Sequence, residues 1–296
     1  MRRPLQLVLS TIAVFALLFA TSAATSAHER GTTFMQTKQA HGGASRTPRS
    51  SNLFFHGGQV ETSPVVFLDF WGDWSGAGSA QTYVTSFFSG VGGSSWANST
   101  TQYCQGVAIG TTQCGGSGTH VSNPPGIYGG SWNDNTSVPT SPTQSQIANE
   151  ASRAASHFGF NSGADYMVLT PSGHSESGFG TQWCAYHSSS GNLSYAYVPY
   201  QPDAGVACGQ DFVNSGGNGQ FDGFSIVGGH EYAETVTDPF PNSGWLDGRG
   251  AENGDKCAWI APGSGPGAAG NVRLSTGTFA AQSLWSNLVS GCVLTS

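Results

Sequence analysis

Runs of apolar residues, separated by turns rich in glycine and serine, divide the chain into predicted strands and helices. The first strong run, 64–71, is rich in β-branched and aromatic residues and is followed by Gly72. A short apolar run that ends at a turn residue predicts a buried strand. In 79–91, aromatic and β-branched residues recur at helical spacing, which predicts a helix after this strand.

The segment 142–158 is the clearest predicted helix. Alanines fill its interior, Pro142 suits its first turn and Gly159 can end it. Further patterns predict strands over 165–170, 182–187 and 193–200, a helix over 224–238, and short strands near 256–260 and 282–285. This order predicts an α+β fold, in which helices pack on a mixed β-sheet within a single domain.

The N-terminal residues predict export. Residues 1–27 combine a basic start, an apolar run too short to span a bilayer and small residues typical of a signal-peptide cleavage site. Residues 28–52 are poor in apolar side chains and are expected to be a flexible leader or pro-segment, ahead of a globular domain over 53–296. We therefore expect a secreted protein with no membrane association after signal cleavage.

The charge content narrows the class of partner. Charged residues make up 9% of the chain, the net charge is −7, and the lysines are Lys38 and Lys256. Because nucleic-acid binding requires clustered Lys and Arg, no nucleic-acid partner is expected.

Six cysteines in an exported chain predict three disulfides. Their order along the chain favours three local pairs, although six cysteines can pair in many other ways. No CxxC motif is present, which disfavours a metal bound by cysteines. The favoured pairs are Cys104–Cys114, Cys184–Cys208 and Cys257–Cys292.

The run His230-Glu231-Tyr232-Ala233-Glu234 carries the main candidate chemistry. On a helix, His230 and Glu234 lie on one face because they are four residues apart, and Glu231 lies about 100° around the axis. The apolar residues of the same segment fall on the opposite side. We therefore expect a helix that buries one side and presents a sector of His and acidic side chains on the other.

This spacing resembles the His-Glu-x-x-His helix of zinc metalloproteases, with Glu234 in place of the second histidine. A carboxylate can also bind zinc. The sequence thus predicts a zincin-like helix in which His230 and Glu234 bind the metal and Glu231 is the general base. Zinc is the expected metal, with Mn, Fe or Ca as alternatives that the added carboxylate makes more credible.

A third metal ligand must come from outside the helix. Glu252 is favoured because it lies in a loop that the neighbouring Cys257 would fix, and Asp255 and His187 are alternatives. Asp238 is a weaker candidate, since an acid before proline more often caps a turn. Glycines inside the helix, at 228–229, suggest that another backbone approaches closely there.

Several short motifs resemble the EXORDIUM / phosphate-induced family of secreted proteins. They occur in the family's order over roughly 53–292: Phe55-His56-Gly57-Gly58-Gln59-Val60, the run 65–72, Trp96 to Tyr103, Cys184-Ala185-Tyr186-His187 and the run 234–240. The resemblance implies secretion, a single domain and a cell-wall association without an assigned reaction. Many plant members lack the His-Glu pair, so the fold can exist without the site.

Two functions are therefore expected. The first is a secreted metal-dependent hydrolase, a peptidase acting on proteins or peptides. The second is a non-catalytic extracellular protein of the EXORDIUM type that binds cell-wall glycans. A serine hydrolase is disfavoured because the chain has no Gly-x-Ser-x-Gly motif.

Overall fold

The computed structural model describes residues 31–42 and 51–296, which form one mixed α/β domain around a six-stranded sheet. The centre of the sheet is parallel, because β3 pairs with β6 and β7, and β7 pairs with β9. Strands β8 and β1 continue it antiparallel. The strands, in spatial order, are β1 (Thr32–Gln36), β8 (Trp183–Ser190), β9 (Leu193–Val198), β7 (Ala164–Leu169), β3 (Val65–Trp71) and β6 (Tyr128–Asp134).

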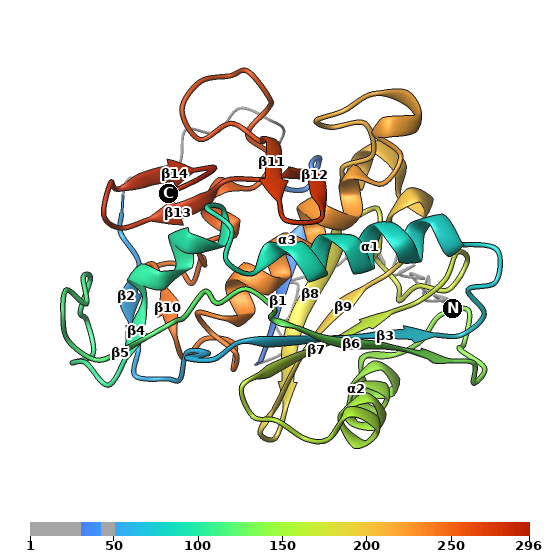
Figure 1. Ribbon diagram of the computed structural model, residues 1–296, viewed down its shortest axis with the longest axis horizontal. Coiled ribbons are helices and arrows are strands. Elements are labelled where there is room, and N and C mark those ends of the chain that lie inside the picture. Colours follow the sequence, from blue (N-terminus) through green and yellow to red (C-terminus); the bar gives the residue numbers. More distant parts are fainter. Residues whose placement is uncertain (1–30, 43–50) are drawn as a thin grey trace, which may run out of the picture.

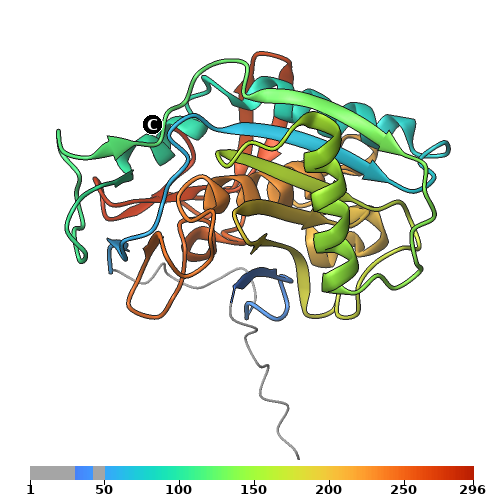
Figure 2. The same ribbon diagram turned by 90° about the horizontal axis from the view of Figure 1, so that it is seen from below.

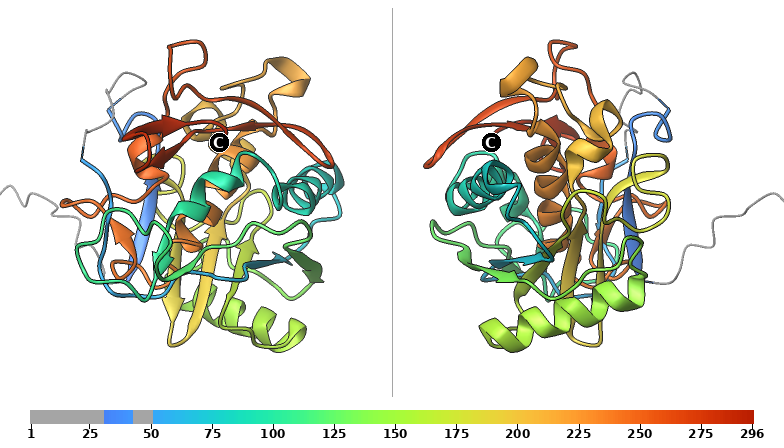
Figure 3. Two further views of the ribbon diagram at one scale, coloured as in Figure 1. Left: turned by 60° about the vertical axis from the view of Figure 1, so that its left-hand side comes forward. Right: turned by 90° about the vertical axis from the view of Figure 1, so that its right-hand side faces the viewer.

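Helices cover both faces of this sheet, as Figures 1 and 2 show. Helix α2 (Gln144–Phe158) packs on one face, against β3, β7 and β9. Helix α3 (Asp222–Thr235) packs on the other face, against β8 and β9, with α1 (Gly78–Val91) beside it. The hairpin of β11 (Gly270–Leu274) and β12 (Gly277–Ala281) then covers α3 and α1 from outside (Figure 3). Helix α3 is therefore an inner element with protein on all sides.

Short elements fill the remainder of the described chain. Three further pairs of strands are β2 (Phe54–Phe55) with β10 (Trp245–Leu246), β4 (Cys104–Gln105) with β5 (Thr119–His120), and β13 (Leu284–Ser286) with β14 (Gly291–Val293). The 3₁₀ turns are η1 (Ala97–Gln102), η2 (Gln201–Asp203), η3 (Gly205–Cys208), η4 (Gly216–Asn218) and η5 (Asp255–Cys257).

Helix α2 begins at a capping box. The Thr143 hydroxyl accepts a hydrogen bond from the Gln146 backbone N–H, and the Gln146 side chain accepts one from the Thr143 backbone N–H. Two of the free N–H groups at the helix start are thus satisfied. Because Thr143 is the cap, the helix starts two residues after Pro142, where the sequence pattern began it.

Two predictions of secondary structure differ from the structure, and one further strand was not predicted. Residues 32–36 lie in the segment expected to be a flexible leader, yet they form edge strand β1, and Met35 is fully buried. The strand expected near 256–260 is replaced by the 3₁₀ turn η5. Strand β6 was not predicted, because the glycines of Tyr128–Asp134 weaken its strand pattern.

The predicted signal peptide, 1–27, lies outside the described residues. None of the described helices has the length and apolar character that crossing a membrane requires. Three disulfides join Cys104 to Cys114, Cys184 to Cys208 and Cys257 to Cys292. These are the pairs that their order along the chain predicts.

Buried carboxyl groups lie between α2 and the sheet. Burial and the neighbouring Glu150 raise the pKa of Asp69 to about 9, and burial raises the pKa of Glu150 to about 7. Burial alone would raise the pKa of Asp134, but hydrogen bonds from Glu150 and Thr136 and the charge of Arg153 lower it. Arg153 pairs with Asp134 at 2.5 Å and with Glu150 at 3.3 Å. The group thus consists of a protonated Asp69 joined through Glu150 to an ionised Asp134.

We expect Asp69→Asn to stabilise the protein above neutral pH. The pKa of Asp69 is about 9 in the folded protein and exceeds the value in the unfolded chain. The contribution of Asp69 to the free energy of unfolding is therefore present at pH 4 and is lost as the pH rises toward 9. Asparagine cannot ionise, so at pH 8 the variant should be more stable by about 1–3 kcal/mol, the usual cost of burying a polar group without full compensation. Urea unfolding at pH 4.5 and pH 8 measures this difference.

The control is Asp73→Asn, which replaces a fully exposed acid whose pKa is lowered by hydrogen bonds with Ser75. Asp73 is ionised at both pH values, so its replacement should leave the pH dependence of stability unchanged. Equal pH dependence in wild type and Asp69→Asn would contradict the assignment.

Candidate metal centre

Helix α3 holds the His-Glu-x-x-Glu run inside the protein rather than at its surface. Every residue of Asp222–Thr235 is buried, and the side chains of His230, Glu231 and Glu234 are fully so. The expectation of an exposed polar sector is therefore wrong. The sheet covers the Glu231 side of the helix, and the β11–β12 hairpin with the loop before η5 covers the other side.

The glycines of α3 have a different cause from the one predicted. A Cβ at Gly229 would lie 3.1 Å from Phe87 Cζ and 3.3 Å from Trp96 Cη2, so aromatic side chains, not a backbone, pack there. The close backbone approach is at Gly254 instead. A Cβ there would lie 2.7 Å from His230 Nδ1 and 2.9 Å from Glu234 Oε1. Glycine at 254 thus lets the loop backbone contact the candidate metal ligands.

One group of candidate ligands lies between α3 and this loop, and we call it the loop-side group: His230, Glu234 and Asp255. The distance from His230 Nε2 to Glu234 Oε1 is 3.0 Å, and the distance to Asp255 Oδ1 is 3.8 Å. The Asp255 side chain is 26% exposed, whereas the other two are fully buried. The group therefore reaches the surface only through Asp255.

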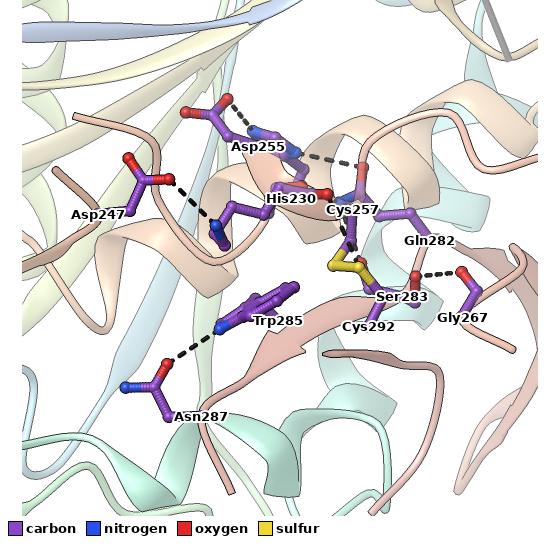
Figure 4. The surroundings of a disulfide bond; sticks show 12 residues. His230, Asp247, Asp255, Cys257, Gly267, Gln282, Ser283, Trp285, Asn287 and Cys292 are labelled. Carbon is purple, nitrogen blue, oxygen red and sulfur yellow. Dashed lines mark hydrogen bonds and ion pairs between the residues drawn. A yellow bond between two sulfur atoms is a disulfide. The ribbon is translucent and has the colours of Figure 1, made fainter. Parts of the chain in front are cut away.

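Gln282 fixes the orientation of His230, as Figure 4 shows. The Gln282 amide nitrogen donates to the carbonyls of Gly254 and Ser283, so its oxygen faces His230 Nδ1 at 3.2 Å and accepts from it. With Nδ1 as donor to Gln282, Nε2 is the ring nitrogen that faces the two carboxylates. This is the usual arrangement of a metal-binding histidine, whose other nitrogen is hydrogen-bonded.

A second group lies between α3 and the sheet, and we call it the sheet-side group: His187, Glu231 and Glu234. His187, on β8, places Nδ1 3.4 Å from Glu231 Oε2 and 3.6 Å from Glu234 Oε2. Its Nε2 lies 3.5 Å from Glu252 Oε1. Glu234 belongs to both groups, through a different oxygen in each.

Many polar atoms in the two groups make no hydrogen bond outside the groups, and these histidine and carboxylate atoms meet only other histidine and carboxylate atoms, in ion pairs. They are both ring nitrogens of His187, Nε2 of His230, both carboxylate oxygens of Glu231 and Oε2 of Glu234. Most buried polar atoms in proteins are hydrogen-bonded, and exceptions require an explanation. In each group the ligand atoms lie within 4.8 Å of one another, a spacing suited to a metal ion. The residues present therefore fit a divalent cation.

The ionisable side chains of the two groups strongly shift one another's pKa values. Burial lowers the pKa of the His230 imidazole, but Glu234 outweighs it and raises that pKa to about 10. Burial would raise the pKa of Glu234, yet the charge of His230 lowers it. Burial and Glu234 raise the pKa of Asp255 to about 7 and that of Glu252 well above its usual range. Without a cation, the two groups must hold protons to offset the acidic charge.

The structure separates the predicted third ligands. Asp255, an alternative in the sequence analysis, joins His230 and Glu234, whereas the favoured Glu252 lies beside His187. Asp238 belongs to neither group. Its carboxylate accepts hydrogen bonds from the backbone N–H groups of Asn242, Ser243 and Gly244, so it caps a turn.

Two residues near the centre escaped the sequence analysis. No sequence pattern points to Gln282, because its contact with His230 depends on the packing of segments that are distant in the chain. Asp165 lies on β7, is fully buried, and has a pKa raised to about 7 by burial. An acid within the apolar run Ala164–Leu169 is a signal that could have identified it. A third possible group, Cys104, Cys114 and His120, has its sulfurs in a disulfide and is not a metal site.

Comparison of the chain with protein-family models, with curated proteins and with solved structures found no match.

Proposed function

We propose that this protein is a secreted, divalent-metal-dependent hydrolase that acts on peptides. The observation that carries the proposal is the convergence of His230 Nε2, Glu234 Oε1 and Asp255 Oδ1 from α3 and the loop before η5. Two of these residues come from the zincin-like spacing, and the third supplies the ligand that such a helix needs from outside. Zinc is the proposed metal, with Mn, Fe or Ca as alternatives suited to two carboxylates.

Each residue has a distinct task in this proposal. When bound, the metal lowers the pKa of water and polarises the scissile carbonyl. Glu231 would be the general base that takes up a proton from water. Burial raises the pKa of Glu231, which brings the carboxyl closer to the working range of a general base. Gln282 keeps His230 Nε2 free for the metal, and the partly exposed Asp255 marks the side from which a substrate approaches.

Glu231→Gln is expected to separate hydrolysis from metal binding at the loop-side group. The amide cannot accept a proton, so peptide hydrolysis should fall by about 10³-fold or more, as for other essential catalytic groups. The loop-side metal should remain, since His230, Glu234 and Asp255 are unchanged. Elemental analysis beside cleavage of a fluorogenic peptide library measures both quantities. Retained hydrolysis in Glu231→Gln would show that Glu231 is not the general base. Hydrolysis by fully metal-free wild type would show that the reaction does not need a metal.

A second proposal, an extracellular binding protein of the EXORDIUM type, is favoured by the burial of the ligands on α3. In that case the metal stabilises the fold and cell-wall glycans bind elsewhere on the surface. Wild type would then be inactive on peptides, would lose thermal stability in a chelator, and would bind glycans equally with and without Glu231→Gln. Loss of glycan binding in Glu231→Gln would contradict this second proposal.

A further inference from the structure

We infer that the centre holds two divalent cations, bridged by the carboxylate of Glu234. The inference deepens the proposed function and rests on its loop-side metal site. Glu234 Oε1 lies 3.0 Å from His230 Nε2, whereas Oε2 lies 3.6 Å from His187 Nδ1. One carboxylate thus faces two imidazoles that approach from different elements, α3 itself and strand β8.

The second cation takes the sheet-side group as its ligands. His187 Nδ1 and Oε2 of Glu231 and Glu234 are the atoms that face one another there. Metal–ligand distances to nitrogen and oxygen are about 2.0–2.2 Å, so atoms of such a group can surround one ion after small shifts. A bridging carboxylate would hold the two ions about 3.5–4 Å apart, as in other two-metal hydrolytic sites.

Further support comes from His187, which is fully buried and whose ring nitrogens face only carboxylates, Glu231 and Glu234 at Nδ1 and Glu252 at Nε2. Imidazole and carboxylate groups are common ligands of divalent cations, so this arrangement suits a bound ion. With Nδ1 on a cation, Nε2 carries the proton and points toward Glu252 Oε1, 3.5 Å away. Glu252 then orients His187 as Gln282 orients His230, which makes Glu252 a positioning residue rather than a ligand.

The acidic charge of the centre is also compatible with a second cation. Four carboxyl groups, those of Glu231, Glu234, Glu252 and Asp255, surround two imidazoles. With one divalent cation, bound protons must offset the remaining negative charge of this buried region, where unpaired charge is costly. Two divalent cations balance the four carboxylates.

The second cation is compatible with the proposed role of Glu231. Oε2 is the oxygen that faces His187, and Oε1 remains uncommitted. Oε2 can therefore bind the sheet-side cation while Oε1 accepts the proton. The substrate class of the proposed function is unchanged.

The test counts metal ions and asks whether they are neighbours. Full-length protein is stripped with a chelator, reloaded with Mn²⁺ alone, and freed of excess metal. We expect two Mn²⁺ per chain, with an electron paramagnetic resonance spectrum broadened by coupling between them. His187→Ala and Asp255→Ala should each retain one ion and give the spectrum of an isolated Mn²⁺. The matched control His174→Ala, at a part-buried histidine whose Nδ1 contacts the Pro139 carbonyl, should retain two.

One Mn²⁺ per chain in wild type, or unchanged stoichiometry in His187→Ala, overturns the inference. Circular dichroism tests whether each variant is folded. If His187→Ala does not fold, the number of Mn²⁺ ions bound by wild type and the wild-type resonance spectrum decide whether there are two cations. The two proposals fail separately. If wild type hydrolyses peptides with one ion bound, the proposed hydrolase function stands and the second cation is contradicted. If wild type binds two coupled ions and hydrolyses no peptide, the two-cation centre stands and the hydrolase function is contradicted.

Discussion

Replacing Glu234 by glutamine is expected to abolish metal binding and hydrolysis together. Glu234 belongs to both ligand groups, through Oε1 beside His230 and Oε2 beside His187. An amide is a weak metal ligand without negative charge, so both groups lose their shared anion at once. We expect metal content near zero and peptide hydrolysis reduced by about 10³-fold or more. Elemental analysis and peptide cleavage on the same preparation measure the two losses.

The matched control is Glu150→Gln, which changes another buried glutamate on another helix, α2. Glu150 lies among Asp69, Asp134 and Arg153 and takes no part in the metal centre. Its replacement should alter stability and leave metal content intact. Full metal content in Glu234→Gln would contradict the bridging role, even if hydrolysis were lost.

Removing the Cys257–Cys292 disulfide is expected to weaken metal binding as well as the fold. The bond closes a loop with a sequence separation of 35 residues, for which the loss of stability is about 3–4 kcal/mol. Cys257 ends η5 (Asp255–Cys257), so it anchors the segment that supplies Asp255 (Figure 4). Without the bond, we expect the affinity for the loop-side metal to fall about 10–100-fold, as when groups that orient ligands are lost.

Double substitution of Cys257 and Cys292 by alanine, followed by metal titration and urea unfolding, measures both effects. The control removes Cys104–Cys114, which has a separation of 10 residues and joins no residue of the metal centre. That variant should lose about 2–3 kcal/mol of stability and keep its metal affinity. Equal loss of affinity in both double variants would mean that general destabilisation, not the anchoring of Asp255, is responsible.

The central strands and the helices follow from local sequence, because burial imposes a local pattern. Strands β3 and β7 lie at the parallel centre of the sheet, and both read as nearly continuous apolar runs. Edge elements give weaker signals. Strand β6 contains glycines, and β1 contains buried threonines, so neither has the apolar pattern of a central strand.

Of the candidate metal ligands, some follow from local sequence and others depend on the packing of distant segments. Helical spacing alone brings His230 and Glu234 together, since they are one turn apart on α3. His187 and Asp255 reach them through the packing of α3 against β8 and the path of the loop before η5. No local pattern encodes either contact. Burial of the site was missed for a related reason, because the β11–β12 hairpin that covers α3 lies some forty residues further along the chain.

Strand β1 has a consequence for how the N-terminus can be processed. Thr33 is paired with His187 across the edge of the sheet, and its side chain contacts Glu252. A mature chain that begins after residue 27 keeps this strand, whereas one trimmed beyond Gln36 would lose it. The trimmed form would expose the backbone edge of β8 to pairing with other chains. It would also lose the strand that pairs with His187 at this edge. The position of the mature N-terminus would then govern both self-association and access of solvent to the centre.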